Sequence, residues 1–220
     1  MRLFREPLLQ LSEYENIRKN LQEKECPVGV EGCVDAQKTH WMASFSGDYP
    51  VKLIITHSEK RVKEIYEDYR FFDKNVYSYP ARDIIFYSAD VHGQLLVGQR
   101  LSVIQRLLEG ESVTVVTTID GLMDSLLPPE RLAEQIIRLQ EGGVADQESL
   151  VKRLVHMGFE RAVQVEGPGQ FAVRGGILDI YNLADECPYR VELWGDEIDS
   201  IRSFDVESQR SIEQVDEVTI

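Results

Sequence analysis

Two short apolar runs rich in β-branched residues most constrain the fold of this chain. They are Val51–Thr56 (VKLIIT) and Val113–Thr118 (VTVVTT). Continuous runs of this length are typical of strands in a parallel sheet, both faces of which are covered by other elements. Between them, Glu59–Phe72 and Gly93–Glu109 carry apolar residues three and four positions apart, which predicts helices. Strands that alternate with helices predict an α/β domain built on a parallel sheet.

Beyond residue 125 the pattern becomes that of a small α+β domain. Glu134–Gln140 is predicted to be a strand, and Asp146 is placed to cap a helix over Gln147–Met157. Phe171–Tyr181 and Arg190–Phe204 each have apolar residues on both sides of a glycine-containing turn, as β-hairpins do. The apolar spacing in the last strand departs from a period of two, which indicates a β-bulge.

Gly32–Thr39 (GCVDAQKT) has the spacing of a phosphate-binding loop that has lost its second glycine. The first glycine, the lysine and the hydroxyl of the pattern G-x-x-x-x-G-K-[ST] are Gly32, Lys38 and Thr39. Gln37 replaces the second glycine, and in a glycine-only backbone conformation it would cost about 1–2 kcal/mol. Asp35 would face the anion, and a carboxylate about 4 Å from a phosphate oxygen weakens binding on the order of a thousandfold. We expect a degenerate loop without nucleotide; residual binding through the lysine and the hydroxyl is the alternative.

Charge and composition restrict the classes of partner. The net charge is −14, and it is unevenly distributed. Residues 1–124 hold 15 Lys and Arg against 19 Asp and Glu, whereas residues 125–220 hold 9 against 19. Affinity for the phosphate backbone of nucleic acids comes from lysine and arginine, so such a chain is poorly suited to hold DNA alone. We expect a protein partner.

Neither a catalytic site nor a metal site is predicted. Three cysteines (Cys26, Cys33 and Cys187) and four histidines lack metal-ligand spacing, and no nucleophile stands in a recognisable motif with a base. No apolar run approaches the roughly 18 residues of a membrane span. We therefore expect a cytoplasmic, non-enzymatic protein without a metal, a cofactor, a small-molecule substrate or a membrane partner.

Two blocks of sequence carry a family resemblance. They are YPARDIIFYSADVHGQLLVGQRLSVIQRLLEGE, from Tyr79, and GQFAVRGGILDIYNLADECPYRVELWGDEIDSIRSFDVESQRS, from Gly169. Both closely resemble the N-terminal part of the bacterial transcription-repair coupling factors (Mfd), which is similar in turn to the excision-repair subunit UvrB. The resemblance covers nearly all of the chain.

The resemblance implies a RecA-like, UvrB-like α/β domain in two pieces with a smaller domain inserted between them. The first piece would be residues 1–124 and the inserted domain residues 125–206. Residues 207–220 would begin the returning piece, which would continue past residue 220. In UvrB the loop that matches Gly32–Thr39 is an ATP site. The stretch that matches the DNA-probing hairpin of UvrB, Pro80–Gly93, is too short to form one.

The resemblance also implies a function. In UvrB the inserted domain docks onto UvrA, and the matching positions here are Arg161, Phe171 and Arg174, with Ala172 in place of a further arginine. The chain would be a noncatalytic fragment that recruits UvrA in transcription-coupled nucleotide excision repair. ATP, Mg²⁺, RNA polymerase and DNA would be bound by other modules of the full-length protein. The alternatives are a UvrB-like ATP-binding, helicase-type module and a DNA-binding module.

Overall fold

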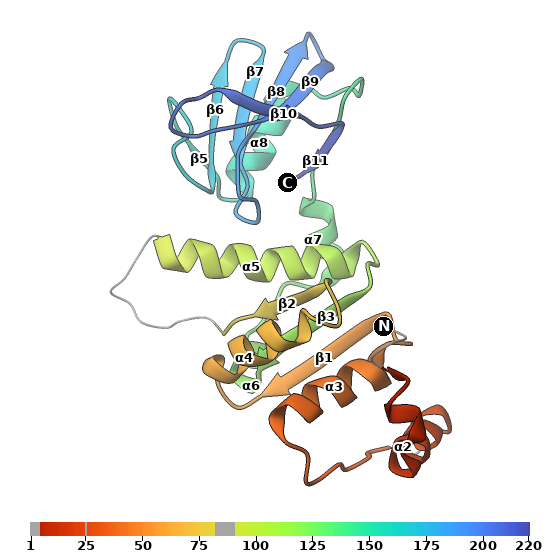
Figure 1. The fold of residues 1–220 in the computed structure, drawn as a ribbon. Coiled ribbons are helices and arrows are strands. Elements are labelled where there is room, and N and C mark those ends of the chain that lie inside the picture. Colours follow the sequence, from red (N-terminus) through yellow and green to blue (C-terminus); the bar gives the residue numbers. More distant parts are fainter. Residues whose placement is uncertain (1–4, 25, 82–90) are drawn as a thin grey trace. The chain divides into compact units, whose positions relative to one another are not determined.

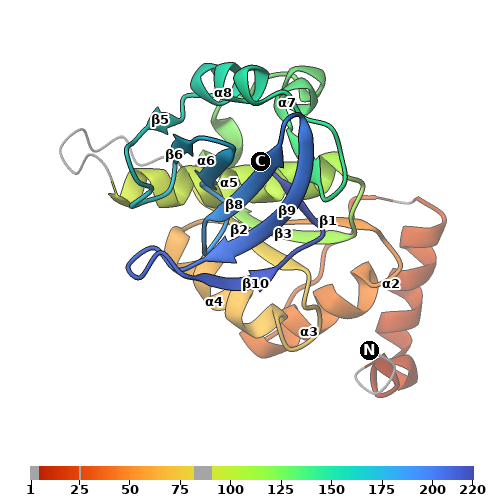
Figure 2. The same ribbon diagram turned by 90° about the horizontal axis from the view of Figure 1, so that it is seen from above.

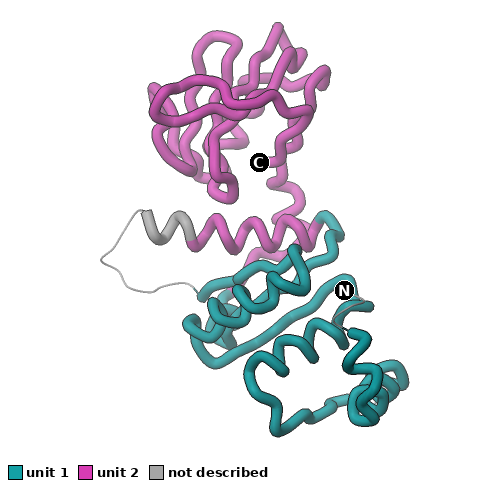
Figure 3. The backbone as a smooth tube through the Cα atoms, in the orientation of Figure 1, with its two compact units in different colours: residues 1–81, 109–124 teal, residues 82–108, 125–220 magenta. Residues whose placement is uncertain are grey.

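The computed structural model describes residues 5–24, 26–81 and 91–220, without the side chains of residues 91–95. It divides the chain into two compact units (Figure 3). Unit 1 contains residues 1–81 and 109–124, and unit 2 contains residues 82–108 and 125–220. Most of the predicted Pro80–Gly93 connection, residues 82–90, lies outside the described residues.

Unit 1 is built on the expected parallel sheet. Its strands are β1 (Val51–Thr56), β2 (Val76–Tyr79) and β3 (Val113–Thr118), in the order β1-β3-β2 (Figure 1). Both neighbours run parallel to β3, whose six residues are all buried. The continuous apolar run at residues 113–118 therefore predicted its position correctly.

The described helices of unit 1 are η1 (Leu8–Gln10), α2 (Ser12–Gln22), α3 (Asp35–Ser46), α4 (Glu59–Tyr69) and α6 (Ile119–Met123). Helix α4 packs against all three strands, whereas α2 and η1 pack on each other. Helix α4 begins where Ser58 Oγ accepts a hydrogen bond from the Arg61 N–H at 3.3 Å, as an N-cap serine does. Its buried residues Val62 and Ile65 pack with Val116 of β3 in the core of the unit.

The prediction that β1 is covered on both faces is wrong for this structure. Val51, Leu53 and Ile55 are each about half exposed, at 51%, 52% and 50%. Among the described strands, β1 is at the edge of the sheet and pairs with β3 alone. An edge strand has fewer neighbours to cover it, and sequence composition does not distinguish it from a central strand.

Unit 2 is mainly antiparallel. Its helices are α5 (Val91–Leu108), α7 (Pro129–Gln135) and α8 (Gln147–His156). Its strands are β4 (Arg138–Gln140), β5 (Glu160–Arg161), β6 (Gln170–Arg174), β7 (Ile177–Tyr181), β8 (Tyr189–Trp194), β9 (Glu197–Phe204), β10 (Ser211–Gln214) and β11 (Glu217–Thr219). Six of them form a sheet in the order β10-β9-β8-β7-β6-β5, and β11 pairs with β4. Strands β8 and β9 run side by side in this sheet (Figure 2).

Helix α8 covers one face of the six-stranded sheet. Asp146 caps it as predicted, because its carboxylate accepts a hydrogen bond from the Ser149 N–H at 2.9 Å. Leu150 and Leu154 of α8 are buried in one core with the inward side chains of β6 to β9. The opposite face of the sheet carries the polar residues described below.

Both predicted hairpins are confirmed, and so is the bulge, which lies where the β8–β9 register shifts after Glu192. The strand predicted at residues 134–140 is largely wrong. Pro129 opens α7, which continues to Gln135, and only Arg138–Gln140 is extended. Proline is favoured in the first turn of a helix, and this preference outweighs the weak alternation of residues 134–137.

Residues 207–220 lie within unit 2. Strand β10 pairs with β9, and β11 pairs with β4, so the described end of the chain extends the second unit. Helix α5 also belongs to unit 2. A Cβ on Gly98 of α5 would lie 1.9 Å from the carbonyl oxygen of Leu183, so glycine is what permits this close approach.

Candidate functional site

The loop at Gly32–Thr39 does not have the wrapped backbone that a phosphate-binding loop requires. Gly32 has a positive φ of 78°, but α3 begins at Asp35, so residues 35–39 of the loop are helical. Gln37 accepts a hydrogen bond from the Val34 N–H at 3.1 Å through its side-chain oxygen. The expected backbone strain at Gln37 is therefore not present, because the residue lies in the first turn of an ordinary helix.

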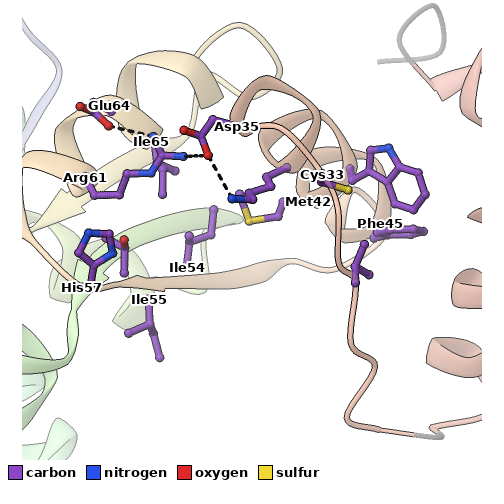
Figure 4. A pocket seen from close by; sticks show the side chains of 14 residues that line it. Cys33, Asp35, Met42, Phe45, Ile54, Ile55, His57, Arg61, Glu64 and Ile65 are labelled. Atoms are coloured by element: carbon purple, nitrogen blue, oxygen red, sulfur yellow. Dashed lines mark hydrogen bonds and ion pairs between the residues drawn. The ribbon is translucent and has the colours of Figure 1, made fainter.

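The two residues that would hold nucleotide and Mg²⁺ are engaged within the same helix. Thr39 is buried, and its hydroxyl donates to the carbonyl oxygen of Asp35 at 3.3 Å. Lys38 Nζ lies 3.1 Å from the carboxylate of Asp35. Arg61 of α4 contacts the same carboxylate at 3.0 Å and also binds Glu64 at 2.8 Å (Figure 4).

Asp35 thus takes the position between two cations that an anionic ligand would need. Its hydrogen bond from Lys38 and the nearby charge of Arg61 lower the pKa of the carboxyl below its usual value. The group is therefore ionised at neutral pH and neutralises part of the positive charge of both side chains. The arrangement supports a loop without nucleotide, which remains a prediction.

The side chains of this cluster form part of the lining of a pocket of about 580 Å³. Its lining is mostly apolar and includes Trp41, Met42, Phe45, Ile54 and Ile65. Within the ranges that the structure describes, no group of three or more His, Cys, Asp or Glu residues could hold a metal ion. In the same ranges, no helix combines the length and the hydropathy needed to cross a bilayer.

The second candidate site lies on the face of the six-stranded sheet opposite α8. Side chains at alternating positions of β6 to β9 point to this face. We call it the Arg174 face, and it carries Arg174, Asp179, Arg190, Glu192 and Arg202. Arg174 stands opposite Ile177, Ile177 opposite Glu192, and Glu192 opposite Ser200, so one row of paired residues crosses the four strands.

A buried carboxylate organises the Arg174 face. The side chain of Asp179 has no exposed surface, yet it binds two arginines. Arg190 donates from Nε to one carboxylate oxygen at 2.7 Å and from Nη2 to the other at 2.9 Å, and Arg174 donates to the second oxygen. Asp179 thus pairs with Arg190 through two hydrogen bonds and with Arg174 through one, and 44% of the Arg174 side chain is still exposed.

Arg190 is held by further contacts. Its guanidinium lies 4.6 Å from the centre of the Phe204 ring, and it donates to the carbonyl oxygen of Gln209 at 3.3 Å. The hydrogen bond to Asp179 raises the pKa of Arg190 above its usual value, although burial acts in the opposite direction. Arg190 is a partly buried support, whereas Arg174 is the exposed member of the group.

Arg161 lies apart from Arg174. It is exposed in the short strand β5, which runs parallel to β6, and its partner in register is Phe171. Arg174 is three positions further along β6, so by alternation the two arginines project to opposite faces near one edge of the sheet. Strand spacing and rise place their Cα atoms roughly 11 Å apart. A single partner would have to contact both the edge and the Arg174 face.

Phe171 is not available at the surface. Its side chain has 0% exposure and packs in the core with Leu154, Leu178 and Ile180. The expectation that it touches a partner directly is therefore corrected, because a side chain without exposed surface stabilises the sheet instead. Arg161 and Arg174 remain as surface candidates.

The reasoning from sequence missed Asp179 and Arg190. Within the first hairpin, the turn at residues 175–176 fixes Asp179 opposite Ala172, on the same face as Arg174. That signal was available in the sequence. The pairing of Asp179 with Arg190 was not, because β7 and β8 are joined by residues 182–188 and not by a tight turn.

Comparison with known proteins gives two findings. Residues 137–220 match the family model of the UvrB interaction domain. The chain is 38% identical over 169 residues to the transcription-repair-coupling factor of Bacillus subtilis (strain 168). The aligned stretch covers 76% of this chain and 14% of that protein.

Similar proteins from staphylococci give consistent values. Identity is 35% over 170 residues with the transcription-repair-coupling factor of Staphylococcus aureus (strain USA300), again 76% of this chain and 14% of the relative. It is 31% over 218 residues with that of Staphylococcus haemolyticus (strain JCSC1435), 96% of this chain and 19% of the relative. The chain thus spans less than one fifth of the length of these relatives.

Proposed function

We propose that this chain, a relative of the transcription-repair-coupling factors that carries a UvrB interaction domain, recruits UvrA in transcription-coupled DNA repair. The supporting observation is Arg174, an exposed guanidinium that donates a hydrogen bond to the buried Asp179 on one face of that domain. Arginine is enriched at interface hot spots because its planar fork pairs with carboxylates in two hydrogen bonds. A guanidinium that is already oriented loses less side-chain entropy on binding.

In this proposal the chain is a noncatalytic module. Unit 1 serves as a scaffold whose nucleotide loop is occupied by its own Asp35, and unit 2 presents the Arg174 face to UvrA. Arg161 contributes from the neighbouring edge. Binding and hydrolysis of ATP with Mg²⁺, and contacts with RNA polymerase and DNA, belong to parts of the full-length relatives beyond the stretch they share with this chain.

Calorimetry with purified UvrA tests the proposal. We expect Arg174→Ala to weaken binding roughly 30-fold, which corresponds to a hot-spot loss of about 2 kcal/mol. Arg131→Ala is the matched control, because that arginine is 73% exposed on α7 and pairs with Glu134 of the same helix. We expect no change in this control. Absence of binding by the wild-type chain would refute the proposed function.

Arg161→Ala tests the edge contribution separately. A contact at the rim of an interface is expected to cost less than one at its centre, so we expect a loss of roughly threefold to tenfold. Unchanged affinity would remove Arg161 from the interface and would leave the role of Arg174 intact.

The second candidate function is a UvrB-like ATP-binding module, which the spacing of Gly32, Lys38 and Thr39 favours. Calorimetry with ATP and Mg²⁺ distinguishes the two. Micromolar binding that Lys38→Ala abolishes would favour the ATP-binding module and would refute the scaffold role of unit 1. A DNA-binding module would instead give tight, salt-sensitive fluorescence anisotropy on duplex or single-stranded DNA at about 150 mM salt.

A further inference from the structure

An exposed tryptophan lies on the same face as Arg174. Trp194 ends β8 with 84% of its surface exposed. Along β8, Val191 and Leu193 point into the core, so Glu192 and Trp194 point to the Arg174 face. Its position beside Arg174 makes Trp194 a candidate anchor for a partner, since burying an indole removes a large apolar area from water.

A second row of cross-strand pairs leads from Trp194 to another exposed apolar residue. Trp194 is paired with Glu197 of β9, and Glu197 forms an antiparallel bridge with Val144. The bridge is supported by the Ala145 N–H, which donates to the carbonyl oxygen of Asp196 at 2.7 Å. Val144 is 83% exposed, and all three residues of this row point to the same face.

The hairpin turns fix the distance from this row to Arg174. Arg174 and Glu192 lie in one row, two strands apart, and Trp194 is two residues further along β8. Strand spacing and rise place the Cα atoms of Arg174 and Trp194 about 12 Å apart. The Leu193 N–H donates to the carbonyl oxygen of Gly176 at 2.7 Å, which ties β8 to the first hairpin turn at this end of the sheet.

We propose that Trp194 and Val144 form, with Arg174, one continuous contact surface for UvrA. The inference rests on the proposed function. The partner surface that fits has a carboxylate to pair with Arg174 and, about 12 Å away, an apolar pocket for the indole. A cation at the rim of that pocket would pair with Glu197 and lie against the electron-rich ring. Aromatic and arginine side chains together are the usual composition of an interface centre.

Charge argues for a protein and against a nucleic acid at this surface. Glu192, Asp196 and Glu197 flank Trp194, and Glu192 already pairs with Arg202 at 3.5 Å. Bases could stack on an indole, but binding of nucleic acid depends on cations that follow the phosphate backbone. Acidic neighbours on both sides of the ring would repel that backbone.

Calorimetry with UvrA and four variants tests this surface. We expect Trp194→Ala to weaken binding roughly 30-fold and Val144→Ser roughly threefold to tenfold, while Arg174→Ala acts as described above. Phe71→Ala is the matched control, because Phe71 is a 79% exposed aromatic residue of unit 1. Since Trp194 is exposed, its removal should leave the thermal midpoint of the chain unchanged, and circular dichroism checks this.

The outcomes separate the inference from the function on which it rests. If wild type binds and Arg174→Ala weakens binding while Trp194→Ala does not, the contact surface is overturned and recruitment of UvrA stands. If wild type does not bind UvrA, both are overturned. Equal losses of UvrA affinity in Trp194→Ala and Phe71→Ala would also overturn the inference. So would a Trp194→Ala variant that loses binding to DNA and binds UvrA as tightly as wild type.

Discussion

Replacing Asp179 with asparagine tests whether a buried carboxylate supports the Arg174 face. The substitution keeps the shape of the side chain but removes its charge. Arg190, whose side chain is only 15% exposed, would then lose the carboxylate that pairs with it, although the charge of Glu192 still acts on it. Breaking a buried ion pair by removing one partner costs about 3–5 kcal/mol. Because Arg190 keeps its contacts with Gln209 and Phe204, we expect the lower end, about 3 kcal/mol of unfolding free energy for unit 2.

Glu192→Gln is the matched control. Glu192 lies on the same face and also pairs with an arginine, Arg202, at 3.5 Å. The two side chains are 31% and 40% exposed, so water screens the pair. Pairs of this kind contribute less than about 1 kcal/mol, and we expect a loss within that limit.

Hydrogen–deuterium exchange on peptides from β6 to β9 measures the effect within unit 2. Tryptophan fluorescence is unsuitable, because Trp194 is exposed in the folded state and Trp41 belongs to unit 1. A loss of about 3 kcal/mol corresponds to roughly a hundredfold faster exchange of the protected amides. Equal protection in Asp179→Asn and Glu192→Gln would refute the reasoning that the buried carboxylate holds this face together.

Three further substitutions test other parts of the chain. Asp35→Asn removes the carboxylate from between its two cations, and we expect at least tenfold tighter binding of ATP by calorimetry; the same affinity as wild type would mean that the helix start itself excludes the anion. Burial raises the pKa of Asp73, but its hydrogen bonds from Asn75, Lys52 and Thr114 outweigh burial and lower the pKa below its usual value. Such a group stabilises the fold above its unfolded pKa of about 4, and the thermal midpoint of unit 1 should fall more steeply below that pH in wild type than in Asp73→Asn; parallel curves would contradict this. Gly98→Ala would place a Cβ 1.9 Å from the oxygen of Leu183, and we expect a loss of about 1–3 kcal/mol by urea unfolding, against no loss in Gly29→Ala, whose Cβ would meet nothing within 4 Å; a fully stable Gly98→Ala would exclude the close approach.

Much of the fold follows from local pattern. The run at Val113–Thr118 is continuous because both faces of β3 are buried, and Asp146 caps α8 because its short carboxylate reaches the free N–H groups of the first turn. The hairpin at residues 171–181 follows from a glycine turn between alternating strands. In each case the physical cause lies within a few residues of its effect.

The candidate site depended more on contacts that are distant in sequence. The spacing of Gly32–Thr39 pointed to a degenerate loop. Its contact with Arg61 could not be predicted, because Arg61 lies in α4, which β1 separates from the helix of Asp35. Phe171 was expected at an interface because of a family motif. Its burial follows from the packing of α8 on the sheet, which a motif does not encode.

By itself, the sequence determined the alternation of strands and helices in the first unit, the two hairpins of the second, and the acidic character that disfavours nucleic acid. These depend on side-chain type and on spacing along the chain. The tertiary structure alone decided that β1 is half exposed, that Asp179 is buried between two arginines, and that Trp194 shares a face with Arg174. Burial and cross-strand register depend on which segments meet in space, and residues many positions apart decide both.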